Sequence, residues 1–409
     1  LIQTPNVDRF SRNATKFTDC YAGGAVCAPS RSVLMTGLHT GHTPVRANAG
    51  TVPILPEDVT IASVLQQAGY ATGAFGKWAL GDAGTTGAAT RKGFDEFFGY
   101  LHQTHAHDYY TEYLRDGEAK YPLPGNAHGK RGQYTADVIQ ERALKFLRAN
   151  RSKPFFLYAC TTLPHGDFDP PDDRPYSDRD WPASEKNYAA MVTRADRHLG
   201  QILSLLQELK LDDQTVVFVA SDNGGTGGAG RKAGDFFHSN GALRAVKGTV
   251  YEGGIRVPML VRWPGHTKAG AVSGFPWYFA DFFPTASQIA GLPAPKGLDG
   301  ISVVPALEGK PQKREGGLYW EQHGYSRKTE KLTNMQQAAR LGDWKGVRPK
   351  PGAALELYNL REDIGEQKNL AAEHPELARR FEEYLKAQHV EPRPHNTGNW
   401  GYGADGVPL

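Results

Sequence analysis

The chain has 409 residues, a formal net charge of +3, 22% charged residues and 39% hydrophobic residues. This balance excludes a disordered acidic chain and a strongly basic nucleic-acid-binding surface, so we expect no nucleic acid among the partners. No apolar run approaches the roughly 18 residues of a transmembrane helix, and we expect no membrane span. Three cysteines are too few for a disulfide framework, so each is a candidate for chemistry.

Helix-like and strand-like segments alternate along the first half of the chain. In chain order the pairs are a helix starting at Thr4-Pro5-Asn6, with Thr4 as its cap, before a strand at 15–21; a helix at 61–68 before a strand at 71–76; a helix at 135–149 before a strand at 154–160; and a helix at 188–209 before a strand at 215–220. Apolar strands separated by helices predict an α/β fold with a mostly parallel central sheet and helices on both faces. Active sites of such sheets lie at the carboxyl ends of the strands.

The pattern changes after about residue 310. Short strands are expected at 317–321, 337–341 and 355–360, followed by a charged amphipathic helix at 375–388. We therefore predict a catalytic domain over 1–310 and a small C-terminal α+β subdomain over 311–409, with an antiparallel sheet and a helix.

The most informative motif is Cys27-Ala28-Pro29-Ser30-Arg31. A proline two positions after the cysteine suits the first turn of a helix, which places Cys27 where free backbone N–H groups favour an anion. Arg31, one turn further, adds positive charge to that position. The plainer alternative is a small buried cysteine before a helix. We expect the other two cysteines, Cys20 and Cys160, to be core residues that remain thiols.

This motif, followed by three residues and Met35-Thr36-Gly37, resembles the signature of type I sulfatases, the formylglycine-dependent, arylsulfatase-like members of the alkaline phosphatase superfamily. Further segments occur in the order such enzymes show: 69–73, 76–78, 92–95, 164–165, 221–224, 247–258 and 357–370. The resemblance implies that Cys27 is oxidised to formylglycine, whose hydrate attacks the sulfur of a sulfate ester.

The resemblance also implies roles for basic residues. Arg31, Lys77 and Lys247 match the cations that stabilise charge on the sulfuryl and leaving oxygens. His165, after the strand at 154–160, matches a residue that hydrogen-bonds sulfate and helps to protonate the leaving oxygen. Taken singly, a lysine is usually a solvated surface charge and a loop histidine is usually structural.

Asp222 and Asn223 follow an expected strand and offer two oxygen ligands for a hard cation. The resemblance implies Ca²⁺, with Mg²⁺ possible, although Asp-Asn-Gly by itself is typical of an ordinary turn. Related enzymes supply further ligands from an Asp-Asp pair on their first strand, and this sequence has no such pair. We interpret the chain as lacking that strand rather than as having lost its metal, and we expect it to be inactive without those ligands.

Ala79 departs from the family pattern, because many members have a histidine at this position. His39, His102, His105 and His107 are candidate substitutes. A second hypothesis assigns substrate binding to His105, His107 and His323, on expected loops at 102–115, 167–181 and 319–327 that include Tyr109, Tyr110, Trp181 and Trp320.

The sequence thus predicts a sulfuric ester hydrolase acting on a sulfated carbohydrate or an aryl sulfate. Alternatives are a phosphate or phosphonate monoester hydrolase of the same superfamily and an inactive sulfoglycan-binding homologue. Implied partners are the sulfated carbohydrate and a formylglycine-generating or anaerobic sulfatase-maturating enzyme, and the implied location is periplasmic or secreted, although the sequence shows no signal peptide. The glycine motif at 225–230 is not interpreted as a dinucleotide site, because no helical apolar pattern follows it.

Overall fold

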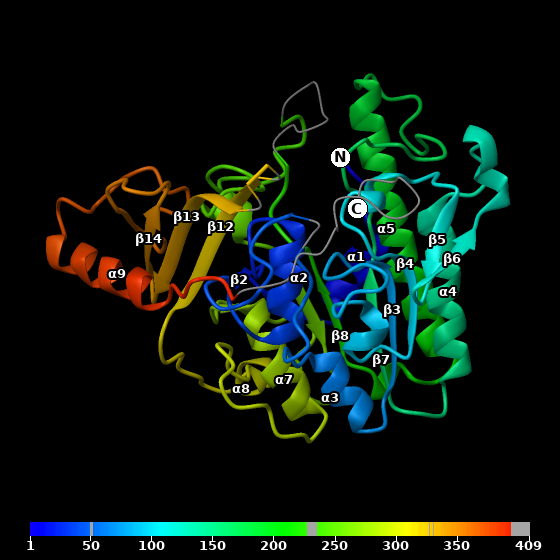
Figure 1. Cartoon of the computed structure of the whole chain (residues 1–409), viewed down its shortest axis with the longest axis horizontal. Coiled ribbons are helices and arrows are strands. Elements are labelled where there is room, and N and C mark those ends of the chain that lie inside the picture. Colours follow the sequence, from blue (N-terminus) through cyan, green and yellow to red (C-terminus); the bar gives the residue numbers. More distant parts are fainter. Residues whose placement is uncertain (50–51, 227–234, 327, 330, 394–409) are drawn as a thin grey trace.

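Strands from residues 71–160 form a five-stranded sheet, which Figure 1 shows on the side of the molecule away from the C-terminal sheet. The computed structural model describes residues 1–49, 52–226, 235–326, 328–329 and 331–393. The strand order is β6 (Ala119–Pro122), β5 (Tyr113–Asp116), β4 (Glu96–Tyr100), β3 (Ala71–Lys77) and β7 (Phe155–Cys160). Strand β3 pairs in parallel with β4 and β7, whereas β5 and β6 extend the sheet in an antiparallel manner. The expected parallel arrangement is therefore confirmed at the centre of this sheet.

The second sheet is mixed. Its order is β10 (Val272–Ser273), β1 (Thr15–Phe17), β9 (Met259–Arg262) and β8 (Val217–Ala220), with β1 parallel to β10 and antiparallel to β9. A separate pair joins β2 (Cys20–Tyr21) to β11 (Trp277–Tyr278). The single strand expected at 15–21 is thus wrong. The chain leaves the four-stranded sheet after Phe17 and joins the two-stranded β2–β11 pair at Cys20.

Helices cover these sheets. They are α1 (Pro5–Arg12), α2 (Cys27–Thr36), α3 (Ile61–Gln67), α4 (Thr135–Ala149), α5 (Ala183–Glu208), α6 (Glu252–Ile255), α7 (Phe282–Ile289) and α8 (Val304–Leu307), with short 3₁₀ turns η1 (Ala89–Lys92), η2 (His105–His107), η3 (Pro124–Gly129), η4 (Asp212–Gln214) and η5 (Phe279–Asp281). None of the described helices is long and apolar enough to cross a membrane.

Helix α1 starts where expected but not by the expected cap. The Thr4 side chain makes no capping hydrogen bond. Instead, the carboxylate of Asp196 on α5 accepts hydrogen bonds from the backbone N–H groups of Asn6 and Val7, at 3.2 and 2.7 Å. A carboxylate at this position satisfies free donors and complements the helix dipole, so a distant residue has replaced the local cap.

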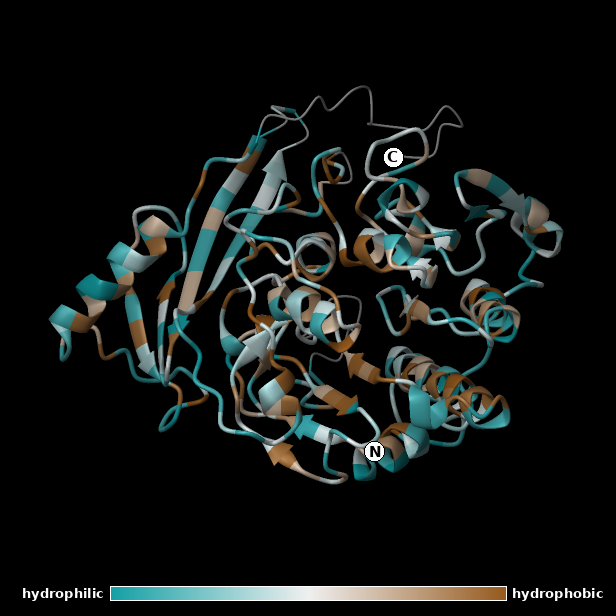
Figure 2. Ribbon diagram, turned by 90° about the horizontal axis from the view of Figure 1, so that it is seen from below, coloured by the Kyte–Doolittle hydropathy of each residue, from teal (hydrophilic) through white to brown (hydrophobic). Residues whose placement is uncertain are grey.

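Each large sheet ends on an apolar strand, β7 in one and β8 in the other. Residues 155–158 and 217–219 are only half-buried, although they are aromatic and aliphatic. Leu157 and Val217 pack against the same cluster of leucines from α4 and α5, so these two strands lie near each other. Colouring by hydropathy shows the apolar residues concentrated in the inner strands and on the inward faces of the helices (Figure 2).

The C-terminal region forms the expected antiparallel sheet and helix, which Figure 1 shows in yellow to red at one side of the molecule. The order is β12 (Leu318–Ser326), β13 (Lys331–Leu341), β14 (Trp344–Arg348) and β15 (Glu356–Asn359), and α9 (Pro375–Ala387) packs on the sheet. Strand β14 was not expected from the sequence; its segment, WKGVR, carries two charges in five residues. The loop expected at 319–327 is wrong, since most of it belongs to β12.

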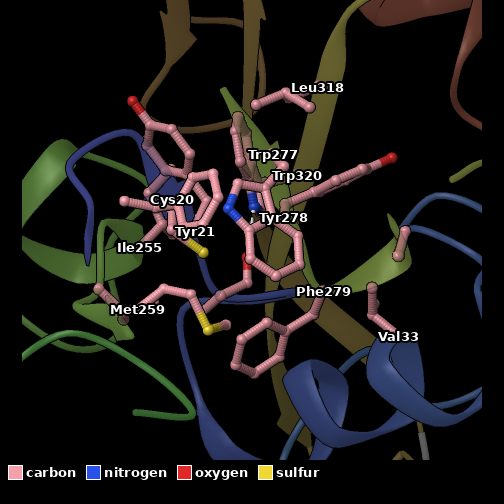
Figure 3. Packing of buried hydrophobic residues seen from close by; sticks show 14 of the residues in the cluster. Cys20, Tyr21, Val33, Ile255, Met259, Trp277, Tyr278, Phe279, Leu318 and Trp320 are labelled. Atoms are coloured by element: carbon pink, nitrogen blue, oxygen red, sulfur yellow. Dashed lines mark hydrogen bonds between the residues drawn. The ribbon is translucent and has the colours of Figure 1, made fainter. Parts of the chain in front are cut away.

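A continuous core joins the small sheet to the rest of the protein (Figure 3). The Trp320 ring packs against Tyr21 and Tyr278, and its Nε1 donates to the carbonyl of Ala22 at 2.9 Å. Trp320 is therefore a core residue and not an exposed sugar-stacking platform. Cys20 lies in the same core as a free thiol, and burial raises its pKa well above the usual value, as expected for a structural cysteine.

Candidate active site

Cys27 is the first residue of α2 and is almost fully buried. Val26 precedes it in an extended conformation and supplies no side-chain cap, so the first backbone N–H groups of the helix need other partners. One of them, on Ala28, donates to Oδ1 of Asn48 at 3.0 Å. The sequence-based expectation that Cys27 begins a helix, with Pro29 in its first turn, is confirmed.

Three basic side chains surround the Cys27 thiol. Lys247 Nζ lies 3.5 Å from Cys27 Sγ, and charge interactions also reach the sulfur from Lys77 and Arg31. Burial by itself raises the pKa of the Cys27 thiol, but the cations outweigh burial and the nearby Asp222, so the net pKa is lowered. The site is therefore electrostatically prepared for an anion.

Lys77 is the last residue of β3 and follows a glycine that is packed closely against β7. Gly76 has φ +127°, and a Cβ there would come within 2.0 Å of the carbonyl oxygen of Cys160 on β7. This close approach of β3 to β7 permits only glycine. Lys77 Nζ is buried and has no hydrogen-bond partner among the described residues, and burial lowers its pKa.

His165 follows β7 and lies against Lys247, with 3.2 Å between its Nε2 and the lysine Nζ. Because an ammonium group only donates, Nε2 of His165 accepts here. Burial and the charges of Lys247 and Lys77 lower the pKa of His165 to about 3, so its imidazole is neutral at pH 7. The ring of His107 stacks on it at 4.3 Å, and burial followed by Lys77 lowers the pKa of His107 to about 3 as well.

Asp222 and Asn223 follow β8 and complete the cluster. Arg31 donates from Nε and Nη2 to Asp222 Oδ2, at 3.1 and 2.8 Å, and from Nη1 to the carbonyl of Lys77 at 2.5 Å. Burial raises the pKa of Asp222, but Arg31 above all outweighs it and the net pKa is about 2. Oδ1 of Asn223 is buried without a hydrogen-bond partner in the described part of the chain.

The oxygens of Asp222 and Asn223 fit a hard cation such as Ca²⁺ or Mg²⁺. An unpartnered buried amide oxygen beside an ionised carboxylate is the donor chemistry these ions take. Two side chains supply only part of the roughly six to eight oxygens that Ca²⁺ requires, so further ligands would have to come from substrate, water or other residues.

A different cluster, His39, His42 and Asp299, places three potential ligand atoms within 4.8 Å of one another. Its hydrogen bonds argue against a metal. His39 Nδ1 accepts from the backbone N–H of Gly41 at 3.1 Å, so the ring proton is on Nε2, which donates to Gln388 Oε1 at 3.1 Å. His42 Nδ1 hydrogen-bonds Asp299 at 2.9 Å. We therefore interpret this cluster as a structural contact that joins the loop after α2 to the segment before α8 and to the end of α9.

The predicted histidines separate into two groups. His107 lies in the Cys27 cluster, and His102 is near enough to His107 to affect its charge state. His105 instead hydrogen-bonds Thr111, and His323 lies in the small sheet beside Glu321, with 2.7 Å between Nε2 and Oε2. These described contacts lie away from Cys27, and the substrate-binding roles of His105 and His323 stay predictions.

Ala79 and the glycine motif at 225–230 were also singled out in the sequence. Ala79 is buried at φ +64°, directly after the Lys77-Trp78 pair, and its methyl group carries no chemistry. The motif at 225–230 lies partly outside the described residues. Cys160 is a buried thiol whose pKa burial raises to about 11, which fits the expected structural role.

Three other residues shape the site in ways that the sequence did not predict, although Tyr109 was named as a candidate on a substrate loop. Asn48 binds the start of α2, Tyr109 binds the turn before His165, and Gln336 binds the turn after Lys247. All three act on backbone groups that are 20 or more residues away in the chain. No motif marks such contacts, because any polar side chain of suitable length makes them.

Comparisons with known proteins agree with this arrangement. Residues 1–292 match the Sulfatase family, and residues 246–391 match the C-terminal region of N-sulphoglucosamine sulphohydrolase. Human N-acetylgalactosamine-6-sulfatase is 32% identical over 337 residues, which cover 75% of this chain and 61% of the human protein. This chain thus spans about three fifths of that relative's length. An N-acetylgalactosamine-6-O-sulfatase of Bacteroides thetaiotaomicron is 26% identical, over 94% of this chain and 88% of its own.

Solved structures show the same fold. Ps i-CgsB, in complex with k-i-k-neocarrahexaose, has a TM-score of 0.80 at 26% identity and covers 96% of this chain and 89% of its own. A phosphonate monoester hydrolase of Agrobacterium radiobacter has a TM-score of 0.68 at 20% identity, covering 95% and 92%, a likeness of fold alone.

Proposed function

Because the chain belongs to the sulfatase family, we propose that it is a sulfuric ester hydrolase and that its substrate is a sulfated carbohydrate. One observation carries the proposal: buried polar atoms without partners among the described residues gather around Cys27. They are Lys77 Nζ, His107 Nε2, His165 Nδ1 and Asn223 Oδ1. Buried polar groups are normally satisfied, so such a group of unsatisfied ones marks a site for a polar ligand.

Each residue of the cluster has its own role in the proposed hydrolysis. Formylglycine made from Cys27 would supply a hydrated aldehyde, whose hydroxyl is the nucleophile toward sulfur. Lys77 and Lys247 bind the sulfate oxygens and stabilise the charge that grows on them. Arg31 holds Asp222 and the Lys77 carbonyl, and thereby orients both. His165, neutral at pH 7, hydrogen-bonds the ester oxygen; the negative charge of a bound sulfate ester raises its pKa, so that His165 takes up a proton from water and passes it to the leaving alcohol.

Asp222 and Asn223 would hold the Ca²⁺ or Mg²⁺, which supplies positive charge beside the nucleophile and the sulfate. We propose that the further ligands lie on a strand outside the 409 residues. Supporting this are the half-buried apolar strands β7 and β8, which each end a sheet and lie near each other. An unpaired apolar edge strand is unusual unless another strand covers it.

Names of the relatives support a carbohydrate substrate. Two of them are N-acetylgalactosamine-6-sulfatases, and a structural neighbour was solved with a neocarrahexaose. We further propose a formylglycine-generating or anaerobic sulfatase-maturating enzyme as a transient partner, and a periplasmic or secreted location. The division into a catalytic domain over 1–310 and a subdomain over 311–409 is proposed on the same resemblance.

Co-expression with a maturating enzyme tests the activity. Peptide mass spectrometry should find formylglycine at Cys27, and the protein, supplied with Ca²⁺ and any missing upstream strand, should cleave aryl sulfate faster than aryl phosphate. Cys27→Ala should abolish turnover, whereas the matched control Cys160→Ala should retain it. Faster cleavage of the phosphate would replace the proposal by the phosphohydrolase alternative. Binding of sulfated glycans without turnover would replace it by the inactive homologue.

A further inference from the structure

The segment that carries Lys247 is held by the small C-terminal sheet. Lys247 itself approaches Cys27 and His165 from the larger part of the protein. On both sides of it, however, the chain between residues 244 and 252 makes hydrogen bonds and ion pairs to strands β13, β14 and β15 and to the turn that follows them. The conformation of the 244–252 segment is therefore set in large part by residues of the small sheet that do not contact Cys27 or His165.

Gln336 on β13 makes the contacts nearest to Lys247. Its Nε2 donates to the carbonyl of Gly248 at 3.2 Å, and its Oε1 accepts from the backbone N–H of Val250 at 3.4 Å. Gly248 has φ +89° and donates its N–H to the carbonyl of Ala25 at 2.9 Å. The turn directly after Lys247 is thus held between the loop that leads to Cys27 and the amide of Gln336.

A buried ion cluster anchors the next residues. Lys345 Nζ on β14 lies 2.8 Å from Glu252 Oε1 and 2.8 Å from Glu366 Oε1, and all three side chains are fully buried. The backbone N–H of Glu252 also donates to Glu366 Oε2 at 2.7 Å. Separating the charges of a buried ion pair is strongly destabilising, because it leaves an uncompensated ion in the core. Helix α6, five residues after Lys247, is therefore fixed to the small sheet.

The residues before and after the turn have further partners. Arg244 Nη1 donates to the hydroxyl of Tyr358 at 2.6 Å and to the carbonyl of Glu366 at 2.9 Å. Tyr251 donates its hydroxyl to Glu356 Oε2 at 2.7 Å. These bonds restrain the same segment at both ends, so Gln336 acts on a turn whose flanks are already held.

We propose that Gln336 is a positioning residue for Lys247, through which the small sheet completes the active site. The proposal rests on the proposed function for its kinetic consequence. Lys247 Nζ must stay within hydrogen-bond distance of the sulfate oxygens, and displacing a catalytic group by about 1 Å can cost about 100-fold in rate. Gln336 fixes the backbone from which that side chain extends.

Gln336→Met tests the proposal, because it keeps the length of the side chain and removes both hydrogen bonds. We expect kcat for an aryl sulfate to fall about tenfold, since the flanking anchors remain. Tyr384→Phe is the matched control: it removes another hydrogen bond of the C-terminal region, which the backbone N–H of Gly317 donates to the Tyr384 hydroxyl, without touching 244–252. Equal kinetic losses in both variants would mean a merely structural role and would overturn the proposal.

A double-mutant cycle with Lys247→Met provides the second readout. If Gln336 acts through Lys247, Gln336→Met should cost nothing further once the lysine is gone. Additive losses would contradict the proposal.

A third readout separates this proposal from the proposed function. In unmatured protein, displacement of Lys247 should raise the pH at which iodoacetamide alkylates Cys27, whether or not the matured protein cleaves sulfate esters. An unchanged alkylation profile in Gln336→Met would refute the positioning role alone.

Discussion

Two buried lysines differ in whether their ammonium groups have hydrogen-bond partners, and the difference separates a structural residue from a candidate site residue. Lys92 Nζ donates to the backbone carbonyls of Leu55, Pro56 and Asp58. Lys77 Nζ is equally buried, and no hydrogen-bond partner for it exists in the described structure. A buried ammonium without hydrogen-bond partners is costly to folding, so we expect Lys77 to lower the stability of the free protein, as a group reserved for an anionic substrate would.

Replacing Lys77 should therefore separate activity from stability. We expect Lys77→Met to lower kcat/KM about 1,000-fold, as loss of a group that stabilises transition-state charge does. Its melting temperature should be unchanged or higher, because a buried unpaired charge is removed. Differential scanning calorimetry and aryl sulfate kinetics measure the two effects.

Lys92→Met is the control for the same chemical change. It should lower the melting temperature, because three carbonyls lose their donor, and should leave the kinetics of the folded fraction close to those of the parent. A Lys77→Met protein that is both active and less stable would contradict our assignment.

The sequence predicted the residues of the central cluster but not those around it. Cys27, Arg31, Lys77, His165 and Lys247 belong to local motifs, and the structure brings all five together. His105 and His107 are two residues apart on one 3₁₀ turn, yet only His107 reaches His165. The direction of a side chain on an irregular turn depends on tertiary packing, which a motif does not encode.

At the scale of elements, the turn after β7 determines where His165 lies. The backbone N–H of His165 donates to the carbonyl of Thr162 at 2.8 Å and closes the turn. The buried hydroxyl of Tyr109 donates to that same carbonyl at 2.8 Å. Burial raises the pKa of Tyr109, so the hydroxyl keeps its proton and remains a donor. Tyr109, which follows η2, thus holds the turn that carries His165, and the ring of His107 stacks on the His165 ring.

Removing the Tyr109 hydroxyl should loosen this turn. We expect Tyr109→Phe to lower kcat several-fold with a smaller change in KM, because substrate binding depends mainly on the lysines, whereas proton transfer depends on the placement of His165. Steady-state kinetics with an aryl sulfate measures both constants.

Tyr110→Phe is the matched control, since the Tyr110 ring packs on Tyr134 and no described hydrogen bond joins it to the His165 turn. A similar loss of kcat in both variants would show that Tyr109 contributes only general packing.

Elements with strong periodic patterns were predicted almost to the residue, and irregular ones were not. Helix α4 runs over Thr135–Ala149 as expected, and β7 begins one residue after its expected start. The 15–21 segment was predicted as one strand but divides between two sheets. Strand pairing depends on partners more than 230 residues away, here β9 and β11, and local sequence carries no record of them.

In the molecule as a whole, the small sheet shares its core with the β2–β11 pair and with α2, the helix that begins at Cys27. The cluster around Trp320 includes residues of β2, α2, β11 and β12 (Figure 3). Buried ion pairs also cross between the two parts, as in Arg340 of β13 with Asp19 and Lys345 with Glu252. Inter-domain contacts of this kind are core-like, so we expect the two parts to unfold together in one transition.

Trp320→Phe tests this cooperativity. The substitution leaves a cavity and removes the hydrogen bond to Ala22, so we expect the free energy of unfolding to fall by about 1–3 kcal/mol. Because Trp320 contacts Tyr21 and Tyr278 of the larger part, the whole denaturant transition should shift as one step, whether followed by far-UV circular dichroism or by Cys27 alkylation.

Trp344→Phe is the matched control, since Trp344 is only partly buried and packs on the other side of the small sheet, near α9 and His374. It should cost less free energy and leave the cooperativity unchanged. Two separate transitions in Trp320→Phe, with Cys27 still protected from alkylation after the small sheet has unfolded, would show that the small sheet is an independent domain. The larger part would then protect Cys27 without the contacts that the small sheet makes to the 244–252 segment.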